Sequence, residues 1–229
     1  MKEWRLITGH SKMTDGQRTE RRPSIGVIGA GWLGGTVGRA LARAGYEVVL
    51  STRHPERLKR DVAGLATARA GSVDEAAACE VIVMATPYDA MPDYGARFAE
   101  HFAGKVVIDA TNPSGSSRLG IEGARIGVGA LSQGYFPAAK LVRCFCAVDA
   151  TCIEDTHGYG ESATLGVPLA GDDAEAMALA ARLVRDTGCD PVVTGGLETA
   201  RLFQRGAPGF RANTDADRLR SLMGVTQSA

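Results

Sequence analysis

The chain has 229 residues, 45% of them hydrophobic and 23% charged, which is the composition of an ordinary globular protein. Its 26 Lys and Arg residues balance 26 Asp and Glu residues, so the net charge gives no support for nucleic-acid binding. Five irregularly spaced cysteines predict no disulfide framework and favour reduced thiols in the cytoplasm.

The two ends of the chain are polar. Residues 1–24 lack the apolar run of a secretory signal, and we expect them to form a disordered extension. Residues 25–205 would form the folded domain, followed by a polar tail over residues 206–229. The longest purely apolar segment, Val81–Ala85, is far shorter than the roughly 20 residues of a membrane helix, so no membrane partner is expected.

Short apolar runs alternate with amphipathic stretches from Ile25 onward. Most runs are apolar along their whole length, which is typical of strands buried on both faces. The predicted strands are Ile25–Gly29, Tyr46–Ser51, Val81–Ala85, Val106–Asp109, Leu141–Phe145, Thr164–Leu169 and Pro191–Thr194.

Helical patterns lie between these runs. Leu33, Val37 and Leu41 recur at helical spacing. A second helical stripe runs from Ala176 to Val184, and Asp172 with Glu175 resembles a capping box at its start. The pattern predicts an α/β fold: a single Rossmann-type, doubly wound, mainly parallel sheet with short extra strands and helices at its C-terminal end.

One long segment fits neither pattern. Residues 112–134 are rich in Gly and Ser, and we expect an irregular stretch there. Because such long loops usually serve a site, this stretch is a candidate lid or substrate loop.

The strongest motif is the glycine-rich turn after the first predicted strand. Gly29 permits a tight turn, Gly31 lets the backbone approach a pyrophosphate, and Gly34 allows close packing of helix and strand. The N-terminus of the following helix offers free N–H groups to phosphates. The turn therefore predicts dinucleotide binding, against the alternative of a glycine turn that binds nothing.

The end of the second strand selects the cofactor. NAD-binding folds usually place an acidic residue there for the ribose 2′-hydroxyl, and this chain has Ser51, Thr52 and Arg53 instead. Hydroxyls and a guanidinium suit a 2′-phosphate. The sequence thus favours NADP(H) over NAD(H).

Two further loops follow strand ends, where ligands of such sheets bind. Thr86 is placed to hydrogen-bond a ribose or phosphate, although the adjacent proline also explains it as a strand terminator. Asn112 is placed to orient a nicotinamide or substrate, although Asn-Pro is also common in turns.

The spacing of Cys144, Cys146, Cys152 and His157 does not favour a metal site, and no catalytic proton donor or nucleophile is evident.

Taken in order, the motifs resemble the NADPH-dependent reductases of the deazaflavin coenzyme F-420. They are also similar to the NADPH domain of the six-transmembrane metalloreductases. The resemblance spans roughly residues 25–204 and is carried by GAGWLGG (29–35), STRHPERL (51–58), VIVMATP (81–87), VVIDATNP (106–113), LVRCFCAV (141–148), VPLAGDDAEA (167–176) and GGLETARLF (195–203).

The resemblance implies further site residues. The pyrophosphate would be held by Gly29, Ala30, Gly31, Trp32 and Leu33, and the 2′-phosphate by Ser51, Thr52 and Arg53. The ribose beside the nicotinamide would be held by Ala85, Thr86 and Pro87. The hydride-transfer pocket would be lined by Asn112, Pro113, Phe145, Cys146 and Ala147, where many relatives carry Asn in place of Cys146.

Together these observations predict an NADPH-dependent oxidoreductase. It would transfer a hydride between NADP(H) and a small acceptor, with coenzyme F-420 or a similar planar or carbonyl-like compound as the co-substrate. The alternative is an NADP-binding sensor without turnover. We expect a cytoplasmic protein with no nucleic-acid or membrane partner. A homodimer is one option for its assembly.

Overall fold

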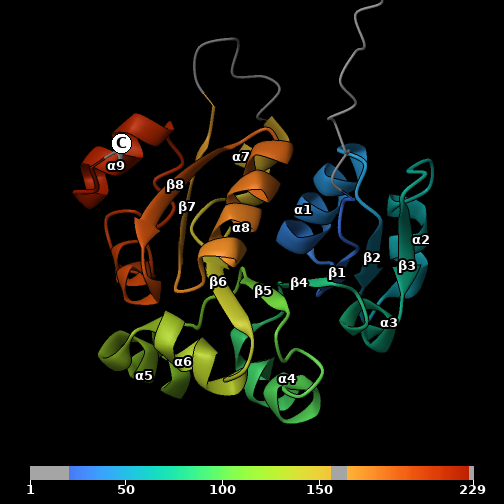
Figure 1. Ribbon diagram of the computed structural model, residues 1–229, viewed down its shortest axis with the longest axis horizontal. Coiled ribbons are helices and arrows are strands. Elements are labelled where there is room, and N and C mark those ends of the chain that lie inside the picture. The colour runs from blue at the N-terminus through green and yellow to red at the C-terminus, as the bar shows by residue number, and fades with distance from the viewer. Residues whose placement is uncertain (1–20, 156–163, 227–229) are drawn as a thin grey trace, which may run out of the picture.

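The computed structural model describes residues 21–155 and 164–226, and Figure 1 shows its ribbon. An eight-stranded sheet runs through the described residues in the order β3-β2-β1-β4-β5-β6-β7-β8. Neighbouring strands are parallel except β6 and β7. The chain reverses direction across the sheet between β1 and β4, as in Rossmann-type folds. The predicted mainly parallel, doubly wound sheet is confirmed.

The strands are short and lie close to the predicted runs. They are β1 (Ile25–Ile28), β2 (Val48–Ser51), β3 (Ala68–Gly71), β4 (Val81–Met84), β5 (Val106–Asp109), β6 (Lys140–Cys144), β7 (Gly166–Gly171) and β8 (Asp190–Gly195). The helices are α1 (Trp32–Arg43), α2 (Pro55–Asp61), α3 (Val73–Ala77), η1 (Tyr88–Ala90), α4 (Met91–Phe98), α5 (Arg118–Ile126), α6 (Val128–Tyr135), α7 (Ala150–Glu154), α8 (Ala174–Asp186), η3 (Leu197–Leu202) and α9 (Ala216–Met223).

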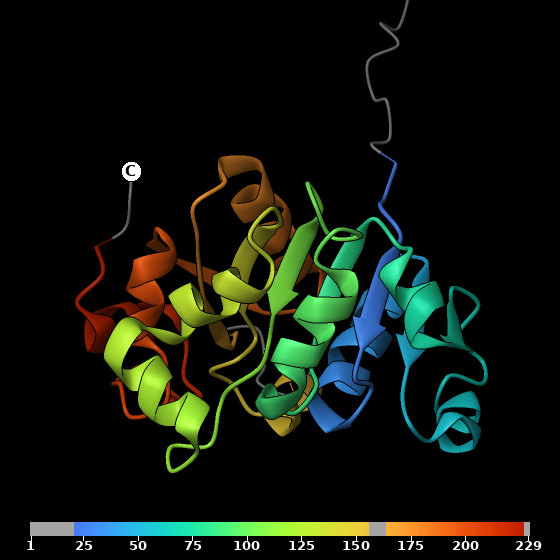
Figure 2. The ribbon, with the colours of Figure 1, turned by 90° about the horizontal axis from the view of Figure 1, so that it is seen from below.

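Helices cover both faces of the sheet. Helices α1 and α8 pack on one face (Figure 1), and α3, α4 and α6 pack on the other (Figure 2). Successive strand residues point to opposite faces. Val27 and Val83 therefore lie in the core under α1 and α8, whereas Ile28 and Met84 lie in the opposite core. Burial on both faces explains why these strands are apolar along their whole length.

Strand β3 has no counterpart among the predicted strands. It reads Ala-Arg-Ala-Gly, pairs with β2 at the edge of the sheet, and is only half-buried or exposed. An edge strand with little burial needs no apolar run, so its sequence carries no strong signal.

The expectation of an irregular loop over residues 112–134 is wrong. Most of this segment forms α5 and α6, which meet at Gly127. The Ser117 hydroxyl caps α5 by accepting from Gly120 N at 3.0 Å. A Cβ at Gly120 would lie 1.8 Å from Ser114 O. Glycine is needed here for close packing, and its abundance weakens the helical pattern in the sequence.

The expectation of a polar tail over residues 206–229 does not hold for the residues described. Asp215 caps α9 by accepting from Arg218 N at 2.9 Å. The helix buries Leu219 and Met223 in a third apolar cluster with Phe203, next to β7 and β8. The segment is polar in composition because α9 is amphipathic and exposes its other face.

Two smaller expectations also change. Helix α8 is capped by Asp173, which accepts from Ala176 N at 2.9 Å, whereas Asp172 accepts from Leu197 N at 2.8 Å. Residues 21–24 lie against the domain, since Ser24 N donates to the Glu80 carboxylate at 2.9 Å. Residues 1–20 of the expected extension lie outside the described residues.

Candidate functional site

Strand register brings the predicted site residues to one edge of the sheet. Ile28, Met84, Asp109 and Arg143 are register partners across β1, β4, β5 and β6. The loops that follow these four residues therefore start side by side at the carboxyl edge. This is the edge where doubly wound sheets bind their ligands.

The glycine-rich turn has the geometry that its sequence predicts. Gly29 has φ +99°, and a Cβ there would lie 2.7 Å from the carbonyl carbon and oxygen of Ala85. A Cβ at Gly34 would lie 2.3 Å from Gly29 O. A Cβ at Gly31, in contrast, would meet no described atom within 4 Å. Gly29 and Gly34 thus allow close packing within the protein, while Gly31 faces open space.

The start of α1 is open to an anionic ligand. Gly31 is its N-cap, and within the described residues no side chain caps this end. The first N–H groups of a helix and its dipole favour a phosphate at such a position. Ala30 and Leu33 are half-buried in the turn, and the Trp32 side chain is 67% exposed beside it.

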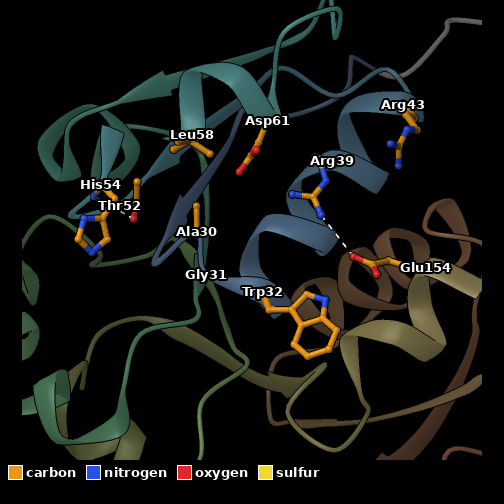
Figure 3. A pocket seen from close by; sticks show the side chains of 10 residues that line it. All are labelled: Ala30, Gly31, Trp32, Arg39, Arg43, Thr52, His54, Leu58, Asp61 and Glu154. Carbon is orange, nitrogen blue, oxygen red and sulfur yellow. Dashed lines mark hydrogen bonds and ion pairs between the residues drawn. The ribbon is translucent and has the colours of Figure 1, made fainter. Parts of the chain in front are cut away.

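A cavity of about 700 Å³ adjoins the turn (Figure 3). It extends from the glycine turn along α1 toward α2 and α7. Its described lining is Ala30, Gly31, Trp32, Arg39, Arg43, Thr52, His54, Leu58, Asp61 and Glu154.

The predicted 2′-phosphate residues separate into different environments. Ser51 is buried and its Oγ donates to Val27 O at 3.1 Å, so this hydroxyl stabilises the strands instead of facing the cavity. Thr52 lines the cavity and accepts from His54 N at 3.3 Å. Arg53 is exposed next to the cavity lining.

Two cations in this cavity were not predicted from the sequence. Arg39 and Arg43 lie on α1, and Arg39 pairs with Glu154 of α7 at 3.4 Å (Figure 3). They follow Trp32 by seven and eleven residues, which places all three on one face of the helix. Counting helical turns from the glycine turn would therefore have identified both arginines in the sequence.

The loop after β4 holds an unsatisfied polar atom. The Thr86 hydroxyl is buried and has no hydrogen-bond partner among the described residues. Buried polar atoms in native proteins are nearly always bonded, so such an atom at a binding edge fits a ligand contact. Ala85 is half-buried against the glycine turn, and Pro87 is exposed.

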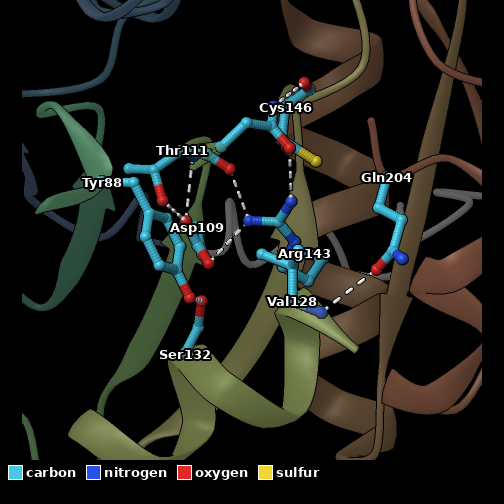
Figure 4. Close-up of polar contacts among 9 residues, drawn as sticks. Tyr88, Asp109, Thr111, Val128, Ser132, Arg143, Cys146 and Gln204 are labelled. Atoms are coloured by element: carbon cyan, nitrogen blue, oxygen red, sulfur yellow. Dashed lines mark hydrogen bonds and ion pairs between the residues drawn. The ribbon is translucent and has the colours of Figure 1, made fainter. Parts of the chain in front are cut away.

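A buried ion pair lies at the ends of β5 and β6, next to the loops that follow these strands (Figure 4). Arg143 and Asp109 are both 0% exposed, and an Arg143 guanidinium nitrogen lies 2.8 Å from Asp109 Oδ2. Burial opposes the charge of Arg143, but the adjacent carboxylate outweighs burial and holds the pKa of Arg143 above its ordinary value. The sequence analysis missed both residues. The available signal was a charged residue directly after an apolar run: Asp109 follows Val106–Ile108, and Arg143 follows Leu141 and Val142.

The predicted hydride-transfer residues are connected through this pair. Asn112 accepts from Arg143 at 3.0 Å, and its Nδ2 donates to Cys146 O at 2.5 Å. Phe145, Cys146 and Ala147 are at most 5% exposed, so this turn is buried. Burial raises the pKa of the Cys146 thiol to about 11. Pro113 is also buried, in the loop after β5.

A buried tyrosine completes this end of the site. The Tyr88 hydroxyl lies 3.0 Å from the Ser132 hydroxyl of α6, next to the Asp109–Arg143 pair (Figure 4). Burial raises the pKa of Tyr88, so its hydroxyl stays protonated at neutral pH.

Metal and membrane features are not found in the described residues. No three described His, Cys, Asp or Glu side chains form a metal-binding group, and His157 of the cysteine and histidine set lies outside them. None of the described helices has the length and apolar character that crossing a membrane needs.

Comparison with known proteins gives a family match over part of the chain. Residues 24–113 match the family described as NADP oxidoreductase, coenzyme F420-dependent. The metalloreductase STEAP3 of Rattus norvegicus is 25% identical over 201 residues, which are 86% of this chain and 39% of that protein. This chain therefore spans about two fifths of the length of that relative.

Solved structures give a consistent result. A candidate F420-dependent NADP reductase from Arthrobacter sp. FB24 superposes with a TM-score of 0.65 and 27% identity, over 78% of this chain and 87% of its own. A hypothetical protein from Sinorhizobium meliloti superposes with a TM-score of 0.72 and 23% identity, over 84% of this chain and 95% of its own. Because its identity is only 23%, the Sinorhizobium match shows similarity of fold alone.

The fold and the glycine turn define a protein of the Rossmann type, and the family and the Arthrobacter structure that it resembles are those of NADP oxidoreductases. Residues 24–113, less than half of the chain, resemble the coenzyme F420-dependent NADP oxidoreductases, and the metalloreductase is a further relative. The family resemblance predicted from the sequence motifs is therefore confirmed.

Proposed function

We propose that this protein binds NADPH at the glycine turn and reduces a small planar acceptor, with the deazaflavin coenzyme F420 as the first candidate. The observation that carries the proposal is the open position at Gly31, where the uncapped start of α1 meets the cavity. The family match and the Arthrobacter structure support the choice of acceptor.

The residues present fit a dinucleotide phosphate. Gly31 leaves space for a pyrophosphate, and the N–H groups at the start of α1 would bind it. The buried Thr86 hydroxyl, unpartnered within the described chain, would bond the ribose beside the nicotinamide. Thr52, Arg53 and the cations of α1 would favour the 2′-phosphate, since no acidic residue ends β2.

NADPH, when bound, supplies a hydride from C4 of the nicotinamide. The protein contributes orientation and exclusion of water at the β4–β6 end of the site. Asn112 and the Phe145–Ala147 turn would form the wall against which the acceptor packs, with Asn112 held by Arg143. A deazaflavin needs little acid catalysis, which agrees with a site where Tyr88 bonds Ser132 internally.

The acceptor is determined by a panel of compounds at fixed NADPH. Purified protein is mixed with F420, FMN, a quinone or ferric citrate, and the absorbance at 340 nm is followed. We expect the fastest loss with F420. Rapid oxidation with the ferric chelate alone would transfer the assignment to metal reduction, which the metalloreductase relative makes the relevant comparison.

The alternative is an NADP sensor without turnover. It predicts tight NADPH binding and no oxidation with any compound in the panel.

We further propose that the protein is a cytoplasmic homodimer, in which case light scattering during gel filtration gives twice the 24.0 kDa of the chain.

A further inference from the structure

The Asp109–Arg143 ion pair is unusual in its burial. Both side chains are 0% exposed; Asp109 is the last residue of β5, and Arg143 is the last but one of β6. Removing two charges from water is costly, and apolar residues of similar size often serve stability equally well. Stability alone is therefore a weak reason for a buried pair at the ligand-binding edge.

The guanidinium of Arg143 joins two strands and the loop after β5. Besides Asp109, it donates to Thr111 O at 2.6 Å and to Asn112 Oδ1 at 3.0 Å. Asp109 in turn accepts from Thr111 N at 2.9 Å. The planar fork thus fixes the backbone and the side chain of this loop together, a task for which lysine has the wrong shape.

Asn112 extends this connection to the loop after β6. Its Nδ2 donates to Cys146 O, so the amide bridges Arg143 and the Phe145–Ala147 turn. The turn is conformationally demanding, because buried Phe145 has φ +60°. Such a backbone persists only when its surroundings hold it.

A second contact holds the turn from the other side. Ala147 O accepts from Arg211 N at 2.8 Å, and Asp149 N donates to Asn213 Oδ1 at 3.0 Å. Arg211 and Asn213, with Phe145, are the three non-glycine residues of positive φ in the described chain. Strained backbone is thus concentrated at this turn, a frequent property of functional sites.

We propose that Arg143 is a positioning residue for the nicotinamide end of the site, acting through Asn112 on the Phe145–Ala147 turn. The strand order supports this location. The cavity beside the glycine turn lies at the ends of β1 and β2, where it would hold the adenosine half of NADPH, and a dinucleotide bound there would cross the switch point between β1 and β4 toward the ends of β5 and β6. The inference rests on the proposed binding of NADPH.

The test compares Arg143→Lys and Asn112→Ala with wild type. Lysine keeps a charge beside Asp109 but cannot make all the bonds of the guanidinium. Asn112→Ala leaves the ion pair in place and removes both bonds of the amide, the one from Arg143 and the one to Cys146 O. Arg97→Lys is the matched control, because Arg97 bonds both oxygens of Asp74 on the exposed surface.

Two readouts separate positioning from binding. NADPH affinity reports on the phosphate contacts, and the fluorescence lifetime of bound NADPH reports how rigidly the nicotinamide is held. We expect both variants to bind NADPH within about 3-fold of wild type but with lifetimes shifted toward that of free NADPH. Turnover with the acceptor that wild type reduces should fall about 10–100-fold, as a displacement near 1 Å does elsewhere.

Each outcome decides the proposal. Wild-type lifetimes and turnover in Asn112→Ala and Arg143→Lys would overturn it, whatever their thermal stability. If Arg143→Lys fails to fold, the lifetime and turnover of Asn112→Ala decide by themselves. Absence of NADPH binding by wild type would instead overturn the proposed function, and this inference with it.

Discussion

Replacing Gly31 with valine is expected to remove dinucleotide binding while leaving the fold in place. Gly31 has φ −75° and ψ −156°, which is extended backbone open to ordinary residues. A Cβ there meets no described atom within 4 Å, so the side chain has room in the free protein. The expected cost is that of a less favourable helix N-cap, about 1 kcal/mol or less. For a chain of this size that lowers Tm by about 2–4 °C.

The effect on binding is much larger. Valine would fill the space through which a pyrophosphate approaches the N–H groups of α1. Each hydrogen bond to a charged group contributes about 1.5–3 kcal/mol. Loss of two such bonds weakens binding by about 3–6 kcal/mol, which is at least about 100-fold in Kd.

The assay pairs isothermal titration with NADPH and thermal unfolding. Gly34→Ala is the matched control, because its Cβ would lie 2.3 Å from Gly29 O and 2.8 Å from Ala85 Cβ. We expect Gly34→Ala to lower Tm far more than Gly31→Val does. Near-native NADPH affinity in folded Gly31→Val would refute the assignment of the phosphate site.

Four further outcomes follow from individual side chains. Arg53→Ala should weaken NADPH binding about 10–100-fold and NADH binding little; equal losses in titrations would contradict a 2′-phosphate role. Tyr46→Phe removes a 2.6 Å bond to Asp186 and should lower the free energy of urea unfolding by about 1 kcal/mol, with no change pointing to a bond of no net value. At pH 8, half-buried Cys152 should be alkylated by iodoacetamide before Cys146, as followed by mass spectrometry. Burial raises the pKa of Cys146 from 9.0 to about 11 on folding. Its contribution to the free energy of unfolding should therefore be intact below pH 9 and be lost as the pH rises through about 11. A urea midpoint that does not change with pH in this range would contradict this.

The parts of the fold that the sequence predicts are those with local signals. The glycine turn lies between an apolar strand and an amphipathic helix, so the roles of Gly29 and Gly34 follow from their spacing. Their contacts with Ala85 and with each other agree with those roles. The parallel strands are recognisable because burial on both faces makes them continuously apolar.

The residues that the sequence did not reveal, or that it placed in the wrong surroundings, depend on tertiary partners. Ser51 has a residue type suited to a phosphate, but its hydroxyl bonds Val27 O across the strand pair. Asp109 and Arg143 are distant in sequence and become a pair only through the register of β5 and β6. Helix α5 is obscured because close packing requires glycine at position 120.

The central claim is that this chain transfers a hydride from NADPH to an acceptor held at the carboxyl edge of the sheet. The most direct measurement uses NADPH deuterated at C4, prepared separately as its two diastereomers, and mixed anaerobically with protein and oxidised F420. We expect stoichiometric loss of absorbance at 340 nm, with deuterium passing to the reduced deazaflavin from one diastereomer only. Tight NADPH binding without oxidation, or equal transfer from both diastereomers, would contradict it.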